Sequence, residues 1–139
     1  MIVLLDTNIL IDVALDRKPF SKDSSRFMDM AERRLFSSFI AWHSISSFYY
    51  IVSSTNNNNE TRKFIKELLQ FVTIAPTTTK DIFYALTLTF PDFEDALQVA
   101  AAKACIAEKI VTWNTKHYKN TPIPAQTPTT FIRDINYRI

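Results

Sequence analysis

Asp6 is the first residue of this chain whose type and position suit chemistry, because it directly follows the apolar run Ile2–Leu5. A short, β-branched run without polar alternation predicts a central strand of a parallel sheet. Ligands of open α/β sheets bind outside the carboxyl ends of the strands, so Asp6 stands where a metal or substrate would bind. Asp6 is equally suited to cap the apolar helix expected after it, and this residue alone does not separate the two roles.

Asp92 and Asp95 form a second candidate site, at the start of an alanine-rich stretch. Three residues apart at a helix start, their carboxylates share one face near the positive end of the helix dipole. The alternative is a cap, with Asp92 as N-cap and Asp95 at N3. Asn114 follows the strand predicted at 110–112 and would add an amide oxygen at the same edge of the sheet as Asp6.

The composition limits which metal and which fold these residues serve. With 139 residues, 47% of them hydrophobic, the chain is predicted to form one domain over 1–139. One cysteine and two histidines are too few for a disulfide framework or a usual zinc site, so a metal would be held by oxygen, which favours Mg²⁺ or Mn²⁺. Cys105 is expected to be a buried, inert thiol.

The absence of glycine excludes two large classes of phosphate-binding site. P-loops and dinucleotide-binding fingerprints need glycines that adopt positive φ and let the backbone approach a phosphate. Left-handed turn positions are therefore expected to be taken by asparagine, most obviously at 56–59. A net charge of +2 permits an anionic partner without requiring one. No apolar run is long enough to span a bilayer, so we expect no membrane association and a cytoplasmic protein.

Strand-like and helix-like segments alternate along the whole chain. Strands are predicted at 2–5, 36–42, 72–75 and 110–112. Helices are predicted after Asp6, at 23–34, after a cap at Ser44, at 60–71, at 79–88, from 92, and from 127. Such alternation implies right-handed crossovers and an α/β fold with a parallel sheet between helical layers.

In order and spacing these motifs resemble those of the PIN domains, metal-dependent nucleases that include the VapC-type toxins of bacterial toxin–antitoxin pairs. The resemblance spans nearly the whole chain, and four segments carry it: Leu5-Asp6-Thr7-Asn8, Asp92-Phe93-Glu94-Asp95-Ala96-Leu97-Gln98, Thr112-Trp113-Asn114 and Thr121-Pro122-Ile123-Pro124. It implies a three-layer α/β/α sandwich with a central parallel sheet, in which the strand ending at Asp6 lies beside the one ending at Thr112.

The resemblance also implies roles for individual residues. The family's first acid falls at Asp6 and its third at Asp95, with Asp92 as an accessory carboxylate, so these three would bind Mg²⁺ or Mn²⁺. The second acid falls at Ser47 and the fourth at Asn114, neither of which carries a charge, although Asn114 would orient a metal-bound water. A nearby position that is often aspartate in relatives is His117 here. With fewer carboxylates, one metal and weak or manganese-favouring activity are expected.

Nucleic acid binding would need cations and aromatic faces around this acidic centre. Arg17, Lys18, Lys116 and Lys119 fall in predicted loops where they would neutralise phosphates, and Trp113 would stack on an unpaired base. The alternatives are solvated loop lysines and a tryptophan that packs at the rim of the core.

The resulting hypothesis is a metal-dependent endoribonuclease that hydrolyses RNA and is the toxin of a toxin–antitoxin pair. An apolar surface on the early helices would serve a homodimer, and a groove there would take an antitoxin segment. The competing hypothesis is a catalytically silent PIN-like domain that binds RNA or a protein partner, which Ser47 and Asn114 favour. Haloacid-dehalogenase-like phosphatases are disfavoured, because they need a second acid where this chain has Asn8.

Overall fold

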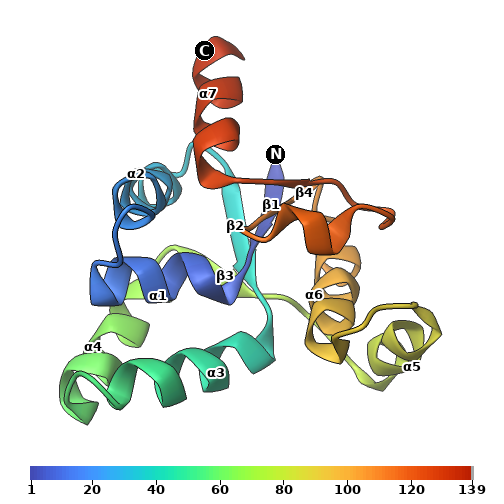
Figure 1. Ribbon diagram of the computed structural model, residues 1–139, viewed down its shortest axis with the longest axis horizontal. Helices are drawn as coiled ribbons and strands as arrows, with labels where there is room; N and C mark the ends of the chain where they lie inside the picture. Colours follow the sequence, from blue (N-terminus) through green and yellow to red (C-terminus); the bar gives the residue numbers. More distant parts are fainter. Residues whose placement is uncertain (139) are drawn as a thin grey trace.

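The computed structural model describes residues 1–138 and consists of one parallel sheet with helices on both faces (Figure 1). The sheet order is β3-β2-β1-β4-β5, and all four pairings are parallel. The strands are β1 (Ile2–Leu5), β2 (Ser37–Ile40), β3 (Val72–Ile74), β4 (Lys109–Val111) and β5 (Ala125–Gln126). This order places β1, the strand that leads to Asp6, at the centre of the sheet.

Seven helices cover the sheet, and a short 3-10 helix follows β4. They are α1 (Thr7–Leu15), α2 (Ser21–Glu32), α3 (Trp42–Ser53), α4 (Asn58–Leu68), α5 (Thr79–Thr87), α6 (Phe93–Ala104), η1 (Thr115–Tyr118) and α7 (Pro128–Arg138). In Figure 1, α1 to α4 lie on one side of the sheet, and α6, with α5 outside it, lies on the other. The predicted three-layer α/β/α sandwich is therefore confirmed.

The alternation of side chains along β1 produces two separate cores. Val3 and Leu5 pack with Phe27, Phe48 and other apolar side chains of the layer that contains α1 to α4. Leu4 faces the opposite way and packs against α6 through Val99 and its neighbours. All three β1 side chains are fully buried, as expected for a central parallel strand.

The pairing of β1 with β4 determines where the polar groups lie. Leu5 is in register with Val111, and the Asp6 amide donates to the Val111 carbonyl at 2.9 Å. Asp6 and Thr112 therefore leave the sheet side by side, as the resemblance implied. None of the helices within residues 1–138 is long and apolar enough to cross a membrane.

The prediction that asparagines take the left-handed turn positions was wrong. The left-handed positions are Asp16, Arg34 and Ile106, not asparagines. Each of these residues directly follows or closely follows the end of a helix, where reversing the chain requires positive φ. In the asparagine run, Asn57 instead caps α4 by accepting from the Glu60 amide.

The start of α3 also differs from the prediction. Trp42 belongs to the helix, its N-cap is Ala41, and Ser44 is a fully buried residue of the first turn. The two-residue strand β5 and the 3-10 helix η1 were not predicted, because neither is long enough to show a hydrophobic period. Cys105 is buried as expected, and this burial raises the pKa of its thiol to about 11.

Candidate acidic active site

An open pocket of about 340 Å³ lies where the start of α1, α3, the start of α6 and the segment after β4 meet. Asp6, Asp92, Asp95 and Asn114, the four predicted catalytic residues, all line it. Glu94, His117, Ser47 and Tyr50 are also among its lining residues. We call this the acidic pocket. It gathers side chains that are up to 111 residues apart in sequence, from Asp6 to His117.

Asp6 is held in the acidic pocket by donors on both carboxylate oxygens. Oδ1 accepts from the Thr7 amide at 2.7 Å, which makes Asp6 the N-cap of α1, and Oδ2 accepts from the Thr112 hydroxyl at 2.7 Å. The residue is only 9% exposed. Burial raises the pKa of Asp6, the bonds from Thr112 and Thr7 lower it, and the negative charge of Asp95 raises it further. Asp6 is thus both a cap and a constrained acid.

Gln98 is a further residue of the site that the sequence interpretation did not identify. Its Nε2 lies 3.2 Å from Asp6 Oδ1 and 2.9 Å from the Ser44 hydroxyl, and the Thr7 hydroxyl donates to Ser44 at 2.7 Å. This network ties α1, α3 and α6 together beneath Asp6. The signal was present in the spacing, because Gln98 follows Asp95 by three residues and so lies on the same side of α6.

Replacing Gln98 with Leu should destabilise the fold by about 1–3 kcal/mol, because it removes two buried hydrogen bonds worth about 0.5–1.5 kcal/mol each. Ser44, which is fully buried, and Asp6, which is 9% exposed, would each lose one donor and keep the one from Thr7. Urea unfolding monitored by circular dichroism would measure the loss. Gln70→Leu is the matched control, since Gln70 is exposed and donates only to the Lys66 carbonyl. Equal stability of Gln98→Leu and wild type would contradict the role of this network.

Asp95 lies deeper than the helix start suggests, with its side chain only 17% exposed. Oδ1 accepts from the Tyr118 hydroxyl at 3.2 Å, and Oδ2 lies 3.2 Å from His117 Nδ1. Burial raises the pKa of Asp95, the charge of Asp92 raises it further, and His117 and Tyr118 lower it. The η1 segment therefore supplies the groups that orient this carboxylate.

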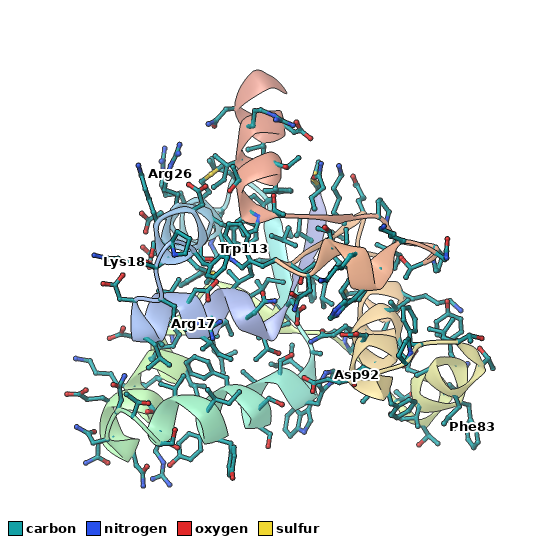
Figure 2. The ribbon with its side chains drawn as sticks, in the orientation of Figure 1. Arg17, Lys18, Arg26, Phe83, Asp92 and Trp113 are labelled. Atoms are coloured by element: carbon teal, nitrogen blue, oxygen red, sulfur yellow. The ribbon has the colours of Figure 1, made fainter. Side chains whose placement is uncertain are left out.

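Asp92 and Glu94 complete the acidic lining. Asp92 is the N-cap of α6 and accepts from the Glu94 amide at 2.9 Å, so the alternative of a capping role holds for it (Figure 2). Glu94 is a fourth acid that the sequence interpretation did not single out. Partial burial raises the pKa of Glu94, and so do the charges of Asp6, Asp92 and Asp95. Mutual repulsion of this kind is relieved by a bound cation.

Two of the predicted nucleic-acid contacts are engaged in internal interactions. The Arg17 guanidinium donates twice to Asp12 Oδ1, from Nε at 2.9 Å and Nη2 at 2.7 Å. Asp12 is fully buried and also accepts from Ser24, whose oxygen accepts from the Trp113 indole at 2.9 Å. Arg17 and Trp113 thus join one network that holds α1, α2 and the segment after β4. For Trp113, packing at the rim of the core is what the structure shows.

The three predicted lysines fall in two places. Lys18 follows the C-terminal end of α1 (Figure 2). Asp6 is the N-cap at the other end, and a helix of nine residues is about 13 Å long. Lys116 and Lys119 flank His117 and are exposed beside the acidic pocket. None of the three lysines makes an ion pair within residues 1–138. Lys116 and Lys119 therefore lie close to His117 of the acidic pocket, and Lys18 lies at the far end of α1.

Comparison with known families identifies this arrangement. A family model described as the PIN domain matches residues 2–116, which include both Asp6 and the Asp92–Asp95 segment. The chain belongs to the PIN-domain family. None of the curated proteins matches the chain in sequence.

Solved structures share the fold of this PIN domain at low sequence identity. VapBC2 from Rickettsia felis, bound to a DNA fragment from its promoter, is 20% identical with a TM-score of 0.67, over 91% of this chain and 98% of that one. A toxin–antitoxin complex from Klebsiella pneumoniae is 21% identical with a TM-score of 0.67, over 91% and 97%. VapC20 from Mycobacterium tuberculosis, a toxin that cleaves the sarcin–ricin loop, is 9% identical with a TM-score of 0.61, over 78% and 86%.

The acidic pocket fits a lightly held divalent cation and not a closed metal cage. Within residues 1–138, no three His, Cys, Asp or Glu side chains are arranged to hold a metal ion. Mg²⁺ needs only one or two carboxylates, since it keeps most of its waters. Asn8 also lines the pocket, and its side-chain nitrogen donates to the Thr112 hydroxyl at 3.3 Å, the same hydroxyl that donates to Asp6.

Ser47, where the resemblance places the family's second acid, lines the acidic pocket of this PIN domain and is uncharged. Asn114 is exposed, and its backbone N–H donates to the Thr112 hydroxyl at 3.0 Å. Glu94 adds a carboxylate that the comparison of motifs had not counted. The pocket therefore keeps four acids despite the two replacements.

Proposed function

We propose that this protein is a metal-dependent endoribonuclease that hydrolyses RNA phosphodiester bonds, and that it is the toxin of a toxin–antitoxin pair. The observation that carries the proposal is the convergence of Asp6, Asp92, Glu94 and Asp95 on one open pocket at the carboxyl edge of the sheet of a PIN domain. Acids at this edge, placed by a central strand and a helix start, suit phosphodiester hydrolysis. Buried acids with raised pKa values are typical of functional sites.

In this proposal Asp6 and Asp95 hold Mg²⁺ or Mn²⁺, and Asp92 and Glu94 add negative charge nearby. The cation would polarise the phosphodiester and supply an activated water. Thr112, Thr7 and Gln98 fix Asp6, while Tyr118 and His117 fix Asp95, so both acids are oriented before a substrate arrives. Asn114, at the exposed lip of the pocket, orients a water.

RNA would enter beside η1, where Lys116 and Lys119 are exposed. These two lysines would neutralise phosphates on either side of the scissile bond. An acidic pocket needs such neighbours, because its own charge repels a nucleic acid backbone. RNA that reaches the four acids this way would be single-stranded or looped, since the pocket is a concavity and not a duplex-sized groove.

An antitoxin partner would cover apolar side chains that are exposed at the rim of the acidic pocket. Tyr50 is 81% exposed and Ile51 is 42% exposed, and both line the pocket from α3, while Trp42 at the start of the same helix is 74% exposed beside a separate cavity. Exposed apolar clusters of this kind mark protein interaction sites. A partner bound there would close the pocket to RNA, which is how an antitoxin would inhibit the toxin.

We propose that the toxin acts as a homodimer in the cytoplasm.

A catalytically silent PIN domain remains the second candidate, and Ser47 and Asn114 are the observations that favour it. In that case the acidic pocket would still bind RNA or a protein, without hydrolysis. Replacing an acid would then leave RNA affinity unchanged, because no cleavage chemistry depends on the charge.

The test of the proposal is cleavage of structured and single-stranded RNA by the purified protein with Mn²⁺, Mg²⁺ or a chelator. Asp6→Asn and Asp95→Asn proteins, purified identically, control for contaminating nuclease. We expect cleavage that requires metal and is absent from both variants. Cleavage equal in wild type and variants, or none with either metal, would reject the nuclease and leave the silent domain.

A further inference from the structure

His117 lies beside Asp95 in the acidic pocket, where its imidazole could influence which metal ion binds. This inference rests on the proposed metal-dependent function. His117 Nδ1 lies 3.2 Å from Asp95 Oδ2, and both side chains line the pocket. The imidazole is 43% exposed and the carboxylate 17%, so the histidine stands at the open side of the acid.

The backbone and its neighbours fix the imidazole in this position. The His117 amide donates to the Asn114 carbonyl at 2.9 Å within η1. The next residue, Tyr118, is 2% exposed and anchors the segment in the core. Its hydroxyl donates to Asp95 Oδ1 at 3.2 Å, which leaves Oδ2 as the oxygen that faces His117. The nitrogen–oxygen pair is therefore set by a buried anchor and not by two free side chains.

The spacing of this pair matches that of two neighbouring ligands of one metal ion. Donor atoms each about 2.1 Å from an octahedral ion and at right angles to one another lie about 3 Å apart. His117 Nδ1 and Asp95 Oδ2 lie 3.2 Å apart, which is close to this separation and is also the length of a hydrogen bond. No three His, Cys, Asp or Glu side chains in the described residues surround one point, so a cation bound at Asp95 Oδ2 would have to draw the imidazole and a second carboxylate toward itself.

We propose that His117 is a direct metal ligand through Nδ1, and that it shifts the preference of the acidic pocket from Mg²⁺ toward first-row transition ions such as Mn²⁺ and Fe²⁺. Imidazole nitrogen is a good ligand for transition ions, whereas Mg²⁺ prefers oxygen and its own waters. The uncharged Ser47 and Asn114 act in the same direction, because fewer carboxylates weaken the binding of hard cations most.

The other reading of the pair is an internal ion pair in which His117 only stands beside Asp95 and leaves when a cation binds. In that case the metal would contact oxygen alone. The two readings differ in one observable, which is whether nitrogen lies in the first coordination sphere of the bound ion.

Pulsed electron paramagnetic resonance of bound Mn²⁺ measures this directly, without any cleavage assay. The chain has only two histidines, and the other, His43, lines a separate cavity with Trp42 and Ala100. Tag-free protein with ¹⁵N-labelled histidine would be compared with unlabelled protein at one bound Mn²⁺. We expect a ¹⁴N coupling that changes to ¹⁵N on labelling, that persists in His43→Gln and that disappears in His117→Asp.

Calorimetric titration of Mn²⁺ and Mg²⁺ provides the second readout. His117→Asp should lower the ratio of Mn²⁺ affinity to Mg²⁺ affinity by about tenfold. This is the lower end of the change in metal affinity that follows mutation of groups near a bound metal. Bound Mn²⁺ without histidine coupling would overturn this inference and leave the nuclease proposal standing. Failure of the wild type to bind either ion would overturn both.

Discussion

Asp6→Asn should abolish metal-dependent RNA cleavage without weakening the fold. Asparagine has nearly the same shape and remains a good N-cap for α1, so the bond from the Thr7 amide is retained. The loss of charge removes a metal ligand, and the rate should fall by at least about a hundredfold, the upper end of the losses seen when only outer-shell partners are removed. Quantified cleavage with Mn²⁺ measures this.

The stability of the same variant separates the two roles that Asp6 could have. Burial and Asp95 raise the pKa of Asp6 from its ordinary value of 3.8, so the folded state binds the proton more tightly than the unfolded chain does. Ionised Asp6 therefore destabilises the fold as pH rises through the raised pKa, and this penalty is absent below the unfolded value. At neutral pH the relief of this penalty offsets the bond from the Thr112 hydroxyl that is lost when Oδ2 becomes an amide nitrogen, so Asp6→Asn should unfold at a temperature close to that of wild type.

A cap with no catalytic role would give the opposite pattern. Cleavage would survive the substitution, and any effect would be confined to thermal stability. Thr79→Ala, at the start of the exposed α5, is a control that leaves the acidic pocket intact. Asp6→Asn that loses both cleavage and its helical circular dichroism signal would contradict the account of a fold-neutral acid.

Arg17→Ala should lower the free energy of unfolding by about 2 kcal/mol. Breaking a buried ion pair from one side costs roughly 3–5 kcal/mol, and the loss here is smaller because the Arg17 side chain is 47% exposed. Asp12 would remain fully buried with only the Ser24 hydroxyl as its side-chain donor. Urea unfolding at pH 7 measures the change.

Lys18→Ala is the matched control for Arg17→Ala, since it removes the neighbouring, exposed cation, which makes no ion pair among the described residues. It should leave both stability and cleavage close to wild type. RNA cleavage by folded Arg17→Ala should also be retained, because its guanidinium faces Asp12. A variant that stays as stable as wild type but loses RNA binding would restore Arg17 to the substrate surface.

The fold was predictable because its strongest elements carry their own sequence signal. The fully apolar β1 and the capped start of α6 are readable from local pattern, and the pairing of β1 with β4 followed from the resemblance. Positions at helix ends were less predictable. Asp16, Arg34 and Ile106 adopt positive φ because the chain must reverse there, and no residue preference announced it.

The candidate site was predictable only in part, for a physical reason. Asp6, Asp95 and Asn114 line one pocket, as their positions directly after a strand or at a helix start suggested. The spacing placed Gln98 on the same side of α6 as Asp95, but its contact with Ser44 beneath Asp6 depends on how three helices meet, which the sequence pattern does not show. Arg17 was assigned to RNA because its partner, Asp12, looked like an ordinary helix residue until its burial was known.

The most direct test of the central claim is the initial rate of cleavage of one single-stranded RNA by wild type and Asp95→Asn, with Mn²⁺ and with chelator. Both proteins would be matched for helical content beforehand. The account predicts cleavage by wild type with Mn²⁺ alone, and no cleavage by Asp95→Asn under either condition. Equal rates for the two proteins, or cleavage that persists in chelator, would contradict it.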